Sequence, residues 1–187
     1  MNPTIDLLLS RRSAPPQTLI EPGPTPQETE ILLRIASRTP DHGKLAPWRF
    51  IVLEGRGRER AGDIAARLYA SDNPNAEEAK LAAERARFSR APLVIAVVSR
   101  AKPHVKIPEW EQVLSAGAAG MNLEIGANAL GYRCSWVTEW CAYDRRFCEA
   151  IGLAAHEKIA GFIHIGRPSA IIEDRPRPKL EEIVTRL

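Results

Sequence analysis

The stretch between Pro108 and Leu130 constrains the fold more than any other part of this sequence. It contains no internal proline and is typical of one long helix, but it is unusually rich in small residues: Ala116, Gly117, Ala118, Ala119, Gly120, Gly126, Ala127 and Ala129. A glycine inside a helix costs about 1 kcal/mol relative to alanine, so three glycines need an offsetting gain. Small side chains let another backbone approach closely. That neighbour is either another part of the same chain or a second copy of the chain, and the sequence favours neither.

Apolar runs elsewhere in the chain predict strands at residues 48–54, 92–99, 132–138 and 158–166. The run PLVIAVVS, at residues 92–99, is continuously apolar and predicts a strand buried on both faces. Further helices are expected at residues 4–10, 58–70, 76–87 and 143–151. Another helix begins at Pro26, because Thr25 suits the N-cap and Glu28 completes a capping box. Strands and helices that do not alternate regularly indicate an α+β fold.

The bulk properties fit one globular domain spanning residues 1–187. The formal net charge of +3 is too small to indicate a nucleic-acid partner. The most apolar long stretch, residues 113–130, carries Asn122, Glu124 and Asn128 and is therefore a poor membrane span. The first residues do not resemble a secretory signal, so we expect a cytoplasmic protein without a membrane association.

The cysteines and histidines give no sign of a metal site or a disulfide framework. Cys134, Cys141 and Cys148 are odd in number and form no CxxC pair, and His156 has no second histidine at zinc-ligand spacing. We therefore expect the three cysteines to be small buried hydrophobic residues and expect no metal.

The familiar catalytic signatures are also missing, including GxSxG, GxGxxG after a strand, GxxxxGK[ST] and HExxH. What remains is a set of polar segments. Arg11-Arg12-Ser13 offers planar guanidinium donors and a hydroxyl, which match a phosphate. Residues 38–48 form a proline-bounded loop with Arg38, Asp41 and His42, which is either a ligand-binding loop or a polar connection.

Taken in order, the segments resemble the nitroreductase family. The landmarks are RRS near the N-terminus, TPDHGKLAPWRF, SAGAAGMNLEIGANALGY leading to WVT, IHIGRP, and RPKLEEIV. They cover residues 8–184, and the short chain with its PDH motif is most similar to the compact NAD(P)H nitroreductases. The resemblance implies an α/β sandwich whose central, mainly antiparallel sheet is flanked by helices. It also implies a homodimer with two FMN sites at its interface and a C-terminal tail that crosses to the partner subunit.

The resemblance further implies which residues bind the cofactor. Those on the phosphate and ribityl side of FMN would be Arg11, Arg12, Ser13, Gly166, Arg167 and Arg177. Those along the isoalloxazine would be Trp136, Val137 and Thr138, with the Thr138 backbone near flavin N5. Arg38 and His42 would approach the flavin of the partner subunit. The segment implied in nicotinamide binding is Gly126, Ala127, Asn128, Ala129, Leu130 and Gly131.

No catalytic side chain is expected, because the FMN carries the chemistry and the protein supplies binding and electrostatics. The implied reaction is a ping-pong hydride transfer from NAD(P)H to a nitroaromatic, a quinone or a similar small-molecule acceptor. The alternative is a flavin-binding storage or sensor protein without efficient NAD(P)H turnover. The sequence departs from the family pattern at Pro15 and Pro16, where a basic residue is frequent, and at Glu139, where a glycine often follows the threonine.

Overall fold

The computed structural model describes residues 2–187, so residue 1 of the predicted domain lies outside the described part. The strands are β1 (Leu19–Ile20), β2 (Trp48–Leu53), β3 (Leu93–Ser99), β4 (Arg133–Val137) and β5 (Lys158–Pro168). The helices are α1 (Pro3–Ser10), α2 (Pro26–Ala36), α3 (Arg56–Asp72), α4 (Glu78–Arg85), α5 (Glu109–Ala129), α6 (Arg145–Ala150) and α7 (Leu180–Ile183). Short 3-10 helices are η1 (Pro16–Thr18), η2 (His42–Lys44), η3 (Arg87–Ser89) and η4 (Trp140–Ala142). Five strands with flanking helices confirm the predicted α+β class.

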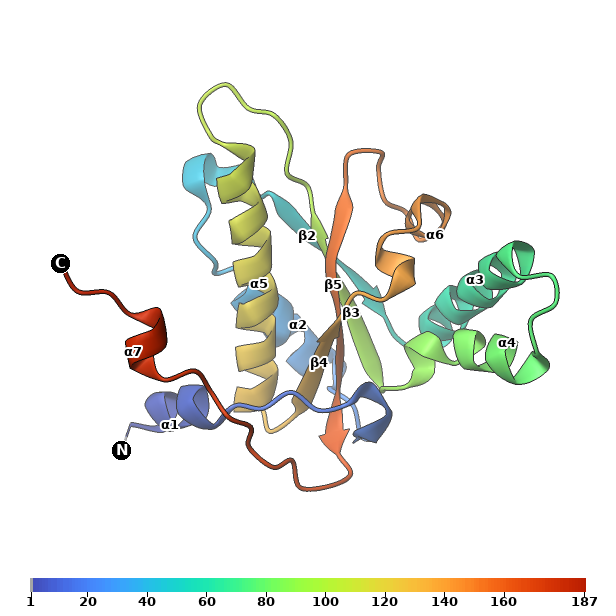
Figure 1. Ribbon diagram of the computed structural model, residues 1–187, viewed down its shortest axis with the longest axis horizontal. Helices are drawn as coiled ribbons and strands as arrows, with labels where there is room; N and C mark the ends of the chain where they lie inside the picture. The colour runs from blue at the N-terminus through green and yellow to red at the C-terminus, as the bar shows by residue number, and fades with distance from the viewer. Residues whose placement is uncertain (1) are drawn as a thin grey trace.

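The sheet is antiparallel throughout and is organised around its longest strand. β5 pairs with β3, β4 and β1, and β3 pairs in turn with β2. Every residue of β3 is buried, as its uninterrupted apolar sequence predicts, because helices cover both faces of the sheet (Figure 1). The predicted central antiparallel sheet is therefore confirmed.

One face of the sheet is covered by α5, with α2 packed beside it (Figure 1). The glycines of α5 show why small residues are needed there. A Cβ atom built on Gly120 would lie 2.6 Å from the Trp136 ring, and one built on Gly126 would lie 3.1 Å from Ile35. A Cβ atom on Gly117 would meet nothing within 4 Å. Two of the three glycines are thus explained inside the chain, and the third faces outward.

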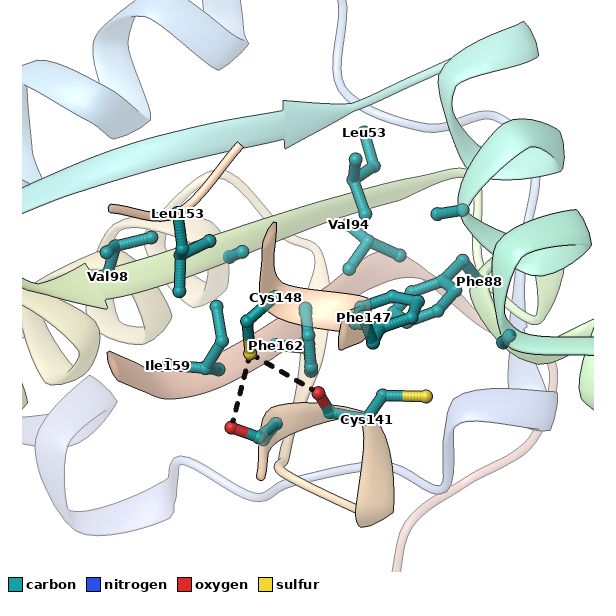
Figure 2. Packing of buried hydrophobic residues seen from close by; sticks show 14 residues of the cluster. Leu53, Phe88, Val94, Val98, Cys141, Phe147, Cys148, Leu153, Ile159 and Phe162 are labelled. Atoms are coloured by element: carbon teal, nitrogen blue, oxygen red, sulfur yellow. Dashed lines mark hydrogen bonds between the residues drawn. The ribbon is translucent and has the colours of Figure 1, made fainter. Parts of the chain in front are cut away.

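The opposite face carries an aromatic cluster formed by Phe88, Phe147 and Phe162 under α3 and α6 (Figure 2). The Phe88 and Phe147 rings stack with centroids 5.4 Å apart, and Phe162 meets Phe88 edge-on at 5.1 Å. Cys141 and Cys148 are buried in the same cluster. Burial raises the pKa of the Cys141 thiol to about 12, so it stays protonated at neutral pH.

The local signals at helix ends agree with the sequence. Thr25 accepts a hydrogen bond from the backbone N–H of Glu28, and the Glu28 carboxylate accepts one from the backbone N–H of Thr25. The predicted capping box at the start of α2 is therefore confirmed. Cys134, like the other two cysteines, is buried and free, which confirms the expected role of all three as small core residues.

Two departures concern the proline-rich segments. β1 has no counterpart among the predicted strands, and β5 continues two residues beyond the predicted end because Leu19 pairs with Pro168. Beyond Pro168 the chain runs past α1 to α7 and leaves apolar side chains exposed (Figure 1). Ile171, Leu180 and Ile183 are the clearest cases. From residue 2 onward, the helices are either too short or too polar to cross a membrane.

Candidate functional site

The residues expected to bind the cofactor fall into two groups at opposite ends of α5. Arg11 lies beside Glu124, close to the C-terminal end of the helix, with Nη1 3.5 Å from Oε2. His42 lies beside Glu111, close to the N-terminal end, with Nδ1 2.7 Å from Oε2. Positions 111 and 124 are 13 residues apart, which is about 20 Å along a helix that rises 1.5 Å per residue. Within one chain the two groups therefore do not meet.

The first group surrounds a cavity of about 520 Å³ that we call the arginine pocket. It lies where the end of α1, the start of β4 and the segment after β5 converge, and it is lined by Ser10, Arg12, Arg133 and residues 168–172. Arg12 donates from Nε to the Glu173 carbonyl oxygen at 3.1 Å, and its Nε lies 3.4 Å from an Asp174 carboxylate oxygen. The pocket is thus bounded by two arginines on one side and by the C-terminal segment on the other.

Arg133 is a lining residue that the sequence interpretation missed. Its Nη1 donates to the Tyr132 carbonyl oxygen at 3.0 Å, which holds the side chain at the first residue of β4. A single arginine at the start of a strand carries no pattern of its own. Only the folded position of the C-terminal segment brings it opposite Arg12.

Ser13 lies along the free edge of β4. It forms an isolated parallel bridge with Cys134, and the next residue, Ala14, donates its N–H to the Cys134 carbonyl oxygen at 2.9 Å. The Arg-Arg-Ser turn is therefore fixed against the strand while Ser13 itself remains exposed.

Arg11 is oriented by a buried carboxylate. Glu124 is 4 % exposed, and burial raises its pKa although the charge of Arg11 opposes the rise. Glu124 Oε1 has no hydrogen-bond partner among the described residues, and the same holds for the buried Oδ1 of Asn128. Buried polar atoms are normally satisfied, so this end of α5 has unused hydrogen-bonding capacity next to the arginine pocket.

Two of the predicted phosphate residues, Gly166 and Arg167, make packing contacts within the chain. A Cβ atom on Gly166 would lie 2.8 Å from Pro92 Cδ and 3.1 Å from the Ile20 carbonyl oxygen, so the glycine permits β1 to cross β5 closely. The Arg167 guanidinium lies 4.2 Å from the Tyr132 ring centroid and donates to the Gly131 carbonyl oxygen at 3.0 Å. Both residues have contacts inside the fold, and their place at the phosphate stays a prediction.

The third predicted phosphate residue near the C-terminus, Arg177, is exposed, and its Nη2 lies 4.0 Å from Asp174 Oδ1. The same carboxylate oxygen contacts Arg12. Arg177 therefore stands at the rim of the arginine pocket rather than in its lining.

The strand segment expected along the isoalloxazine directs its side chains to both faces of the sheet. Trp136 faces α5, where its Nε1 donates to the Ala160 carbonyl oxygen at 3.0 Å. Val137 faces the other side and packs on the aromatic cluster. Thr138 accepts a hydrogen bond from the Tyr143 hydroxyl at 3.3 Å. A flavin beside this segment would consequently meet the strand edge and its backbone.

The residue that follows, Glu139, has an unusual backbone conformation that was not predicted from the sequence. Its φ of 54° and ψ of −177° belong to a region almost restricted to glycine. Its carboxylate accepts hydrogen bonds from Arg90 at 2.7 and 3.1 Å and pairs with Arg87 at 2.7 Å. Burial acts to raise the pKa of Glu139, but the hydrogen bonds from Arg90 and Arg87 outweigh it and lower the pKa. Two arginines thus hold a strained residue at the end of β4.

The second group lies on the loop between α2 and β2. Arg38 and His42 are exposed, and two non-glycine residues have positive φ: Lys44, the last residue of η2, at 55°, and Ala46, shortly after it, at 46°. The Asp41 carboxylate accepts the backbone N–H groups of Leu45 and Ala46 at 3.0 and 2.8 Å. The loop is therefore shaped by its own hydrogen bonds and presents its cations outward.

The predicted nicotinamide segment is largely inside the protein. Gly126, Ala127 and Asn128 are buried against α2 and the neighbouring turn, where the glycine contacts Leu32 and Ile35. Only the end of the segment, residues 129–131, reaches the surface. In the single chain the first half of the segment packs on α2, and its role in nicotinamide binding stays a prediction.

Comparisons with known proteins agree with this arrangement. The family model described as "Nitroreductase family" matches residues 10–167. YdjA of Escherichia coli K12, named as a proposed NAD(P)H nitroreductase, is 39 % identical over 170 residues, covering 88 % of this chain and 87 % of that protein.

Solved structures show the same fold. A nitroreductase-like protein of Bacillus cereus has a TM-score of 0.84 and 24 % identity, covering 100 % of this chain and 97 % of that one. The FMN- and NADPH-dependent nitroreductase NfnB from sphigopyxis sp. strain HMH has a TM-score of 0.73 and 15 % identity, with 98 % of each chain covered.

Proposed function

Because the chain belongs to the nitroreductase family, we propose that it is an FMN-dependent oxidoreductase that transfers hydride from NAD(P)H to a small electron-poor acceptor. A nitroaromatic or a quinone represents the acceptor class. The observation that carries the proposal is the arginine pocket beside β4, in a chain whose family model covers Ser10, Arg12 and Arg133 of its lining.

The residues present fit FMN. The pocket volume of about 520 Å³ falls within the range of roughly 300–1,000 Å³ that is usual for small-molecule and cofactor sites. Arg12 and Arg133 line it, and the exposed Ser13 lies at its side. Guanidinium groups and a hydroxyl are the donors that a phosphate monoester accepts. Arg11 adds a further cation, held in place by Glu124.

The protein's own part in the reaction is binding and charge stabilisation. Bound FMN supplies the hydride chemistry, in a ping-pong sequence in which NAD(P)H and the acceptor use the same pocket in turn. The arginines neutralise the phosphate, while the free edge of β4 up to Thr138 offers backbone groups to the ring system. No side-chain acid, base or nucleophile is needed in this scheme.

We further propose that the active unit is a homodimer built across the outer side of α5. A two-fold axis near the middle of α5 would place the helices antiparallel. The loop of one copy that carries Arg38 and His42 would then lie at the arginine pocket of the other copy. Within one copy, this loop and the arginine pocket are about 20 Å apart along α5. Gly117 has no neighbour within 4 Å in the single chain, and Trp110 is 68 % exposed. The apolar side chains of the tail after residue 168 would cover the partner subunit.

The cofactor proposal is tested by substitutions in the pocket. Arg133→Ala removes a charged hydrogen-bond donor, worth roughly 1.5–3 kcal/mol, and should weaken FMN binding about ten- to hundredfold. Arg56→Ala, at the start of α3, is the matched control that removes an arginine outside the pocket. Flavin fluorescence quenching measures the dissociation constants. Equal affinities for wild type and Arg133→Ala would place the phosphate elsewhere.

Turnover separates the enzyme from a storage or sensor protein. The FMN-loaded chain should oxidise NAD(P)H in the presence of a nitroaromatic or a quinone, and Arg133→Ala should lose this rate in proportion to its lost flavin. A protein that binds FMN tightly but shows no such oxidation contradicts the enzymatic proposal and leaves the storage function.

A further inference from the structure

A second cavity with a basic lining lies at the other end of α5 from the arginine pocket. It has a volume of about 260 Å³ and lies between residues 45–47, the loop leading into α5, and the turn before β5. Its lining includes Arg100, Lys102, His104 and His156, and no acidic residue from the described part of the chain is among them. We call it the basic cavity. Residues 45–47 belong to the TPDHGKLAPWRF segment, but none of the residues predicted to bind FMN or nicotinamide is among the lining residues.

The positive charge of Arg100 is not fully balanced by the neighbouring carboxylate. Its Nε lies 3.5 Å from Glu157 Oε1, but that carboxylate is already paired with Arg49 through hydrogen bonds of 2.8 and 2.7 Å. The Glu157 carboxylate also accepts the Ala154 N–H at 2.9 Å. The hydrogen bonds from Arg49 are the main reason that the pKa of Glu157 is lowered to about 2. One ionised carboxylate thus faces two guanidinium groups, which leaves a net positive charge beside the cavity.

His104 and Lys102 are presented by a fixed loop. His104 Nδ1 accepts the backbone N–H groups of Lys106 and Ile107 at 3.2 and 3.1 Å, so the proton of a neutral ring is on Nε2, which is a donor. The buried Gln112 of α5 holds the Lys102 backbone by accepting its N–H at 3.2 Å and donating to its carbonyl oxygen at 2.9 Å. The His104 ring and the Lys102 backbone are therefore positioned by hydrogen bonds within the protein.

The opposite wall is strained backbone. Ala46 has a φ of 46° and is held there by the Asp41 carboxylate, which accepts its N–H at 2.8 Å. A non-glycine residue in this region persists only where its surroundings hold it, and such residues concentrate at functional sites. Strain, fixed donors and excess positive charge thus coincide at one cavity.

We propose that the basic cavity binds a small oxyanion, a phosphate or a carboxylate, carried by a substrate. Its volume suits one anionic group rather than a whole dinucleotide. The donors are the Arg100 guanidinium, the Lys102 ammonium and the imidazole N–H of His104. Two sources supply such a group, a phosphate of the nicotinamide nucleotide or a carboxylate on the acceptor. The choice between these two sources rests on the proposed function, in which residues 38–48 reach the flavin of the partner subunit. The existence of the oxyanion site does not depend on the proposed function.

The test uses the full chain saturated with FMN, so that the arginine pocket does not compete for the probe. Inorganic phosphate is titrated while NMR follows the imidazole signals of His104 and His156. Both should shift and saturate, while the signals of His42, which lies outside the cavity, should stay in place. Lys102→Gln should weaken the apparent affinity about tenfold. Lys106→Gln removes the same charge from the same loop outside the lining and should leave affinity within about twofold.

The proposal is overturned if the His104 signal does not saturate with phosphate. It is also overturned if the apparent phosphate affinity falls equally in Lys102→Gln and Lys106→Gln. NADPH, NADH and 4-nitrobenzoate then identify the source, since only the ligand whose anionic group enters the cavity reproduces the His104 shift. A chain that fails to bind FMN but still shows the phosphate-dependent shift upholds the oxyanion site and refutes the flavin proposal. The two failures are therefore distinguishable.

Discussion

The two faces of the sheet bury apolar surface in different ways. Under α3 and α6, three phenylalanine rings pack at centroid distances between 5.1 and 6.3 Å, and none of them is more than 1 % exposed. Under α5, the contact is made by glycine and alanine, so that backbones and the Trp136 ring approach each other closely. The first face fills the core with large side chains. On the second face, glycines without a side chain let α5 lie close to Trp136 of β4 and to α2.

The outer sides of the covering helices differ as well. The outer side of α5 exposes Trp110, Val113 and Leu114, and α1 adds Leu9, which is 76 % exposed. Exposed apolar side chains scattered singly are normal, but a contiguous group marks an interaction surface. The aromatic face is therefore complete within one chain, whereas the α5 layer is completed by whatever covers its outer side. The following predictions test this difference, beginning with the largest effect.

Phe162→Ala should lower the free energy of unfolding by roughly 3–5 kcal/mol, because the space left between two other rings cannot close fully. Val105→Ala, in an almost fully exposed loop residue, should change it by no more than about 0.5 kcal/mol. Urea denaturation followed by circular dichroism measures both. A loss below about 1 kcal/mol for Phe162→Ala would show that the aromatic cluster is loosely packed.

Acid should destabilise the protein through His164, whose imidazole is fully buried on β5. Burial, and then the charge of Arg90, lower its pKa from 6.5 to about 4. The unfolded state therefore binds a proton that the folded state does not, and stability falls as the pH drops from about 6.5 to about 4. The full effect is about 3 kcal/mol, at 1.36 kcal/mol per pKa unit. Unfolding free energies of wild type, His164→Phe and the exposed control His156→Gln, each measured from pH 7 to pH 4, isolate this contribution. An identical acid dependence in wild type and His164→Phe would contradict the assignment.

The glycines of α5 permit a finer test. Gly120→Ala places a methyl group against the Trp136 ring and should cost about 1–3 kcal/mol of folding stability. Gly57→Ala, at a helical glycine with open space around it, should be neutral or stabilising by up to about 1 kcal/mol. Thermal unfolding compares the two variants. If Gly120→Ala were as stable as Gly57→Ala, the close approach of α5 to the sheet would not depend on this glycine.

The smallest effect on the fold, with a large effect on assembly, is expected at Gly117. Gly117→Leu has room in the single chain, so its secondary structure should be unchanged. Across the proposed two-fold axis the side chain would separate the helices, and sedimentation velocity should show a monomer that has lost most of its FMN. Gly57→Leu also has room and should remain dimeric. A flavin-loaded dimer of Gly117→Leu refutes the proposed interface.

The sequence allowed the main elements to be predicted where the signal is local. The apolar runs of β3 and β5 and the capping box of α2 predicted those elements within a few residues. β1 was missed because it contains only two residues and exists through pairing with the distant Pro168. The helix at residues 108–130 was found from its composition, but the separate roles of its glycines depend on Trp136 and Ile35, which lie outside the helix and contact it only in the folded chain.

The candidate site divides along the same line. Arg11, Arg12 and Ser13 are adjacent in the sequence and could be recognised as one turn. Arg133 could not, because its place in the pocket depends on the chain after β5 folding back over it. The contacts of Arg167 could not be predicted from the sequence for a related reason. Its charge suits a phosphate, but in the fold the Tyr132 ring and the Gly131 carbonyl occupy its guanidinium.

The conformation of Glu139 also limits the order in which this protein can change during evolution. Glycine at this position would remove the strain of its positive φ, but it would also remove the carboxylate that pairs with both Arg87 and Arg90. Arg87 would keep Glu84 as a counterion, whereas Arg90 would be left with the Arg87 carbonyl oxygen and a neighbouring like charge. Contacting residues have non-additive mutational effects. Glu139→Gly is therefore destabilising while Arg90 is present and stabilising once Arg90 has been replaced. In this chain the change from glutamate to glycine at position 139 therefore has a required order, in which Arg90 changes first.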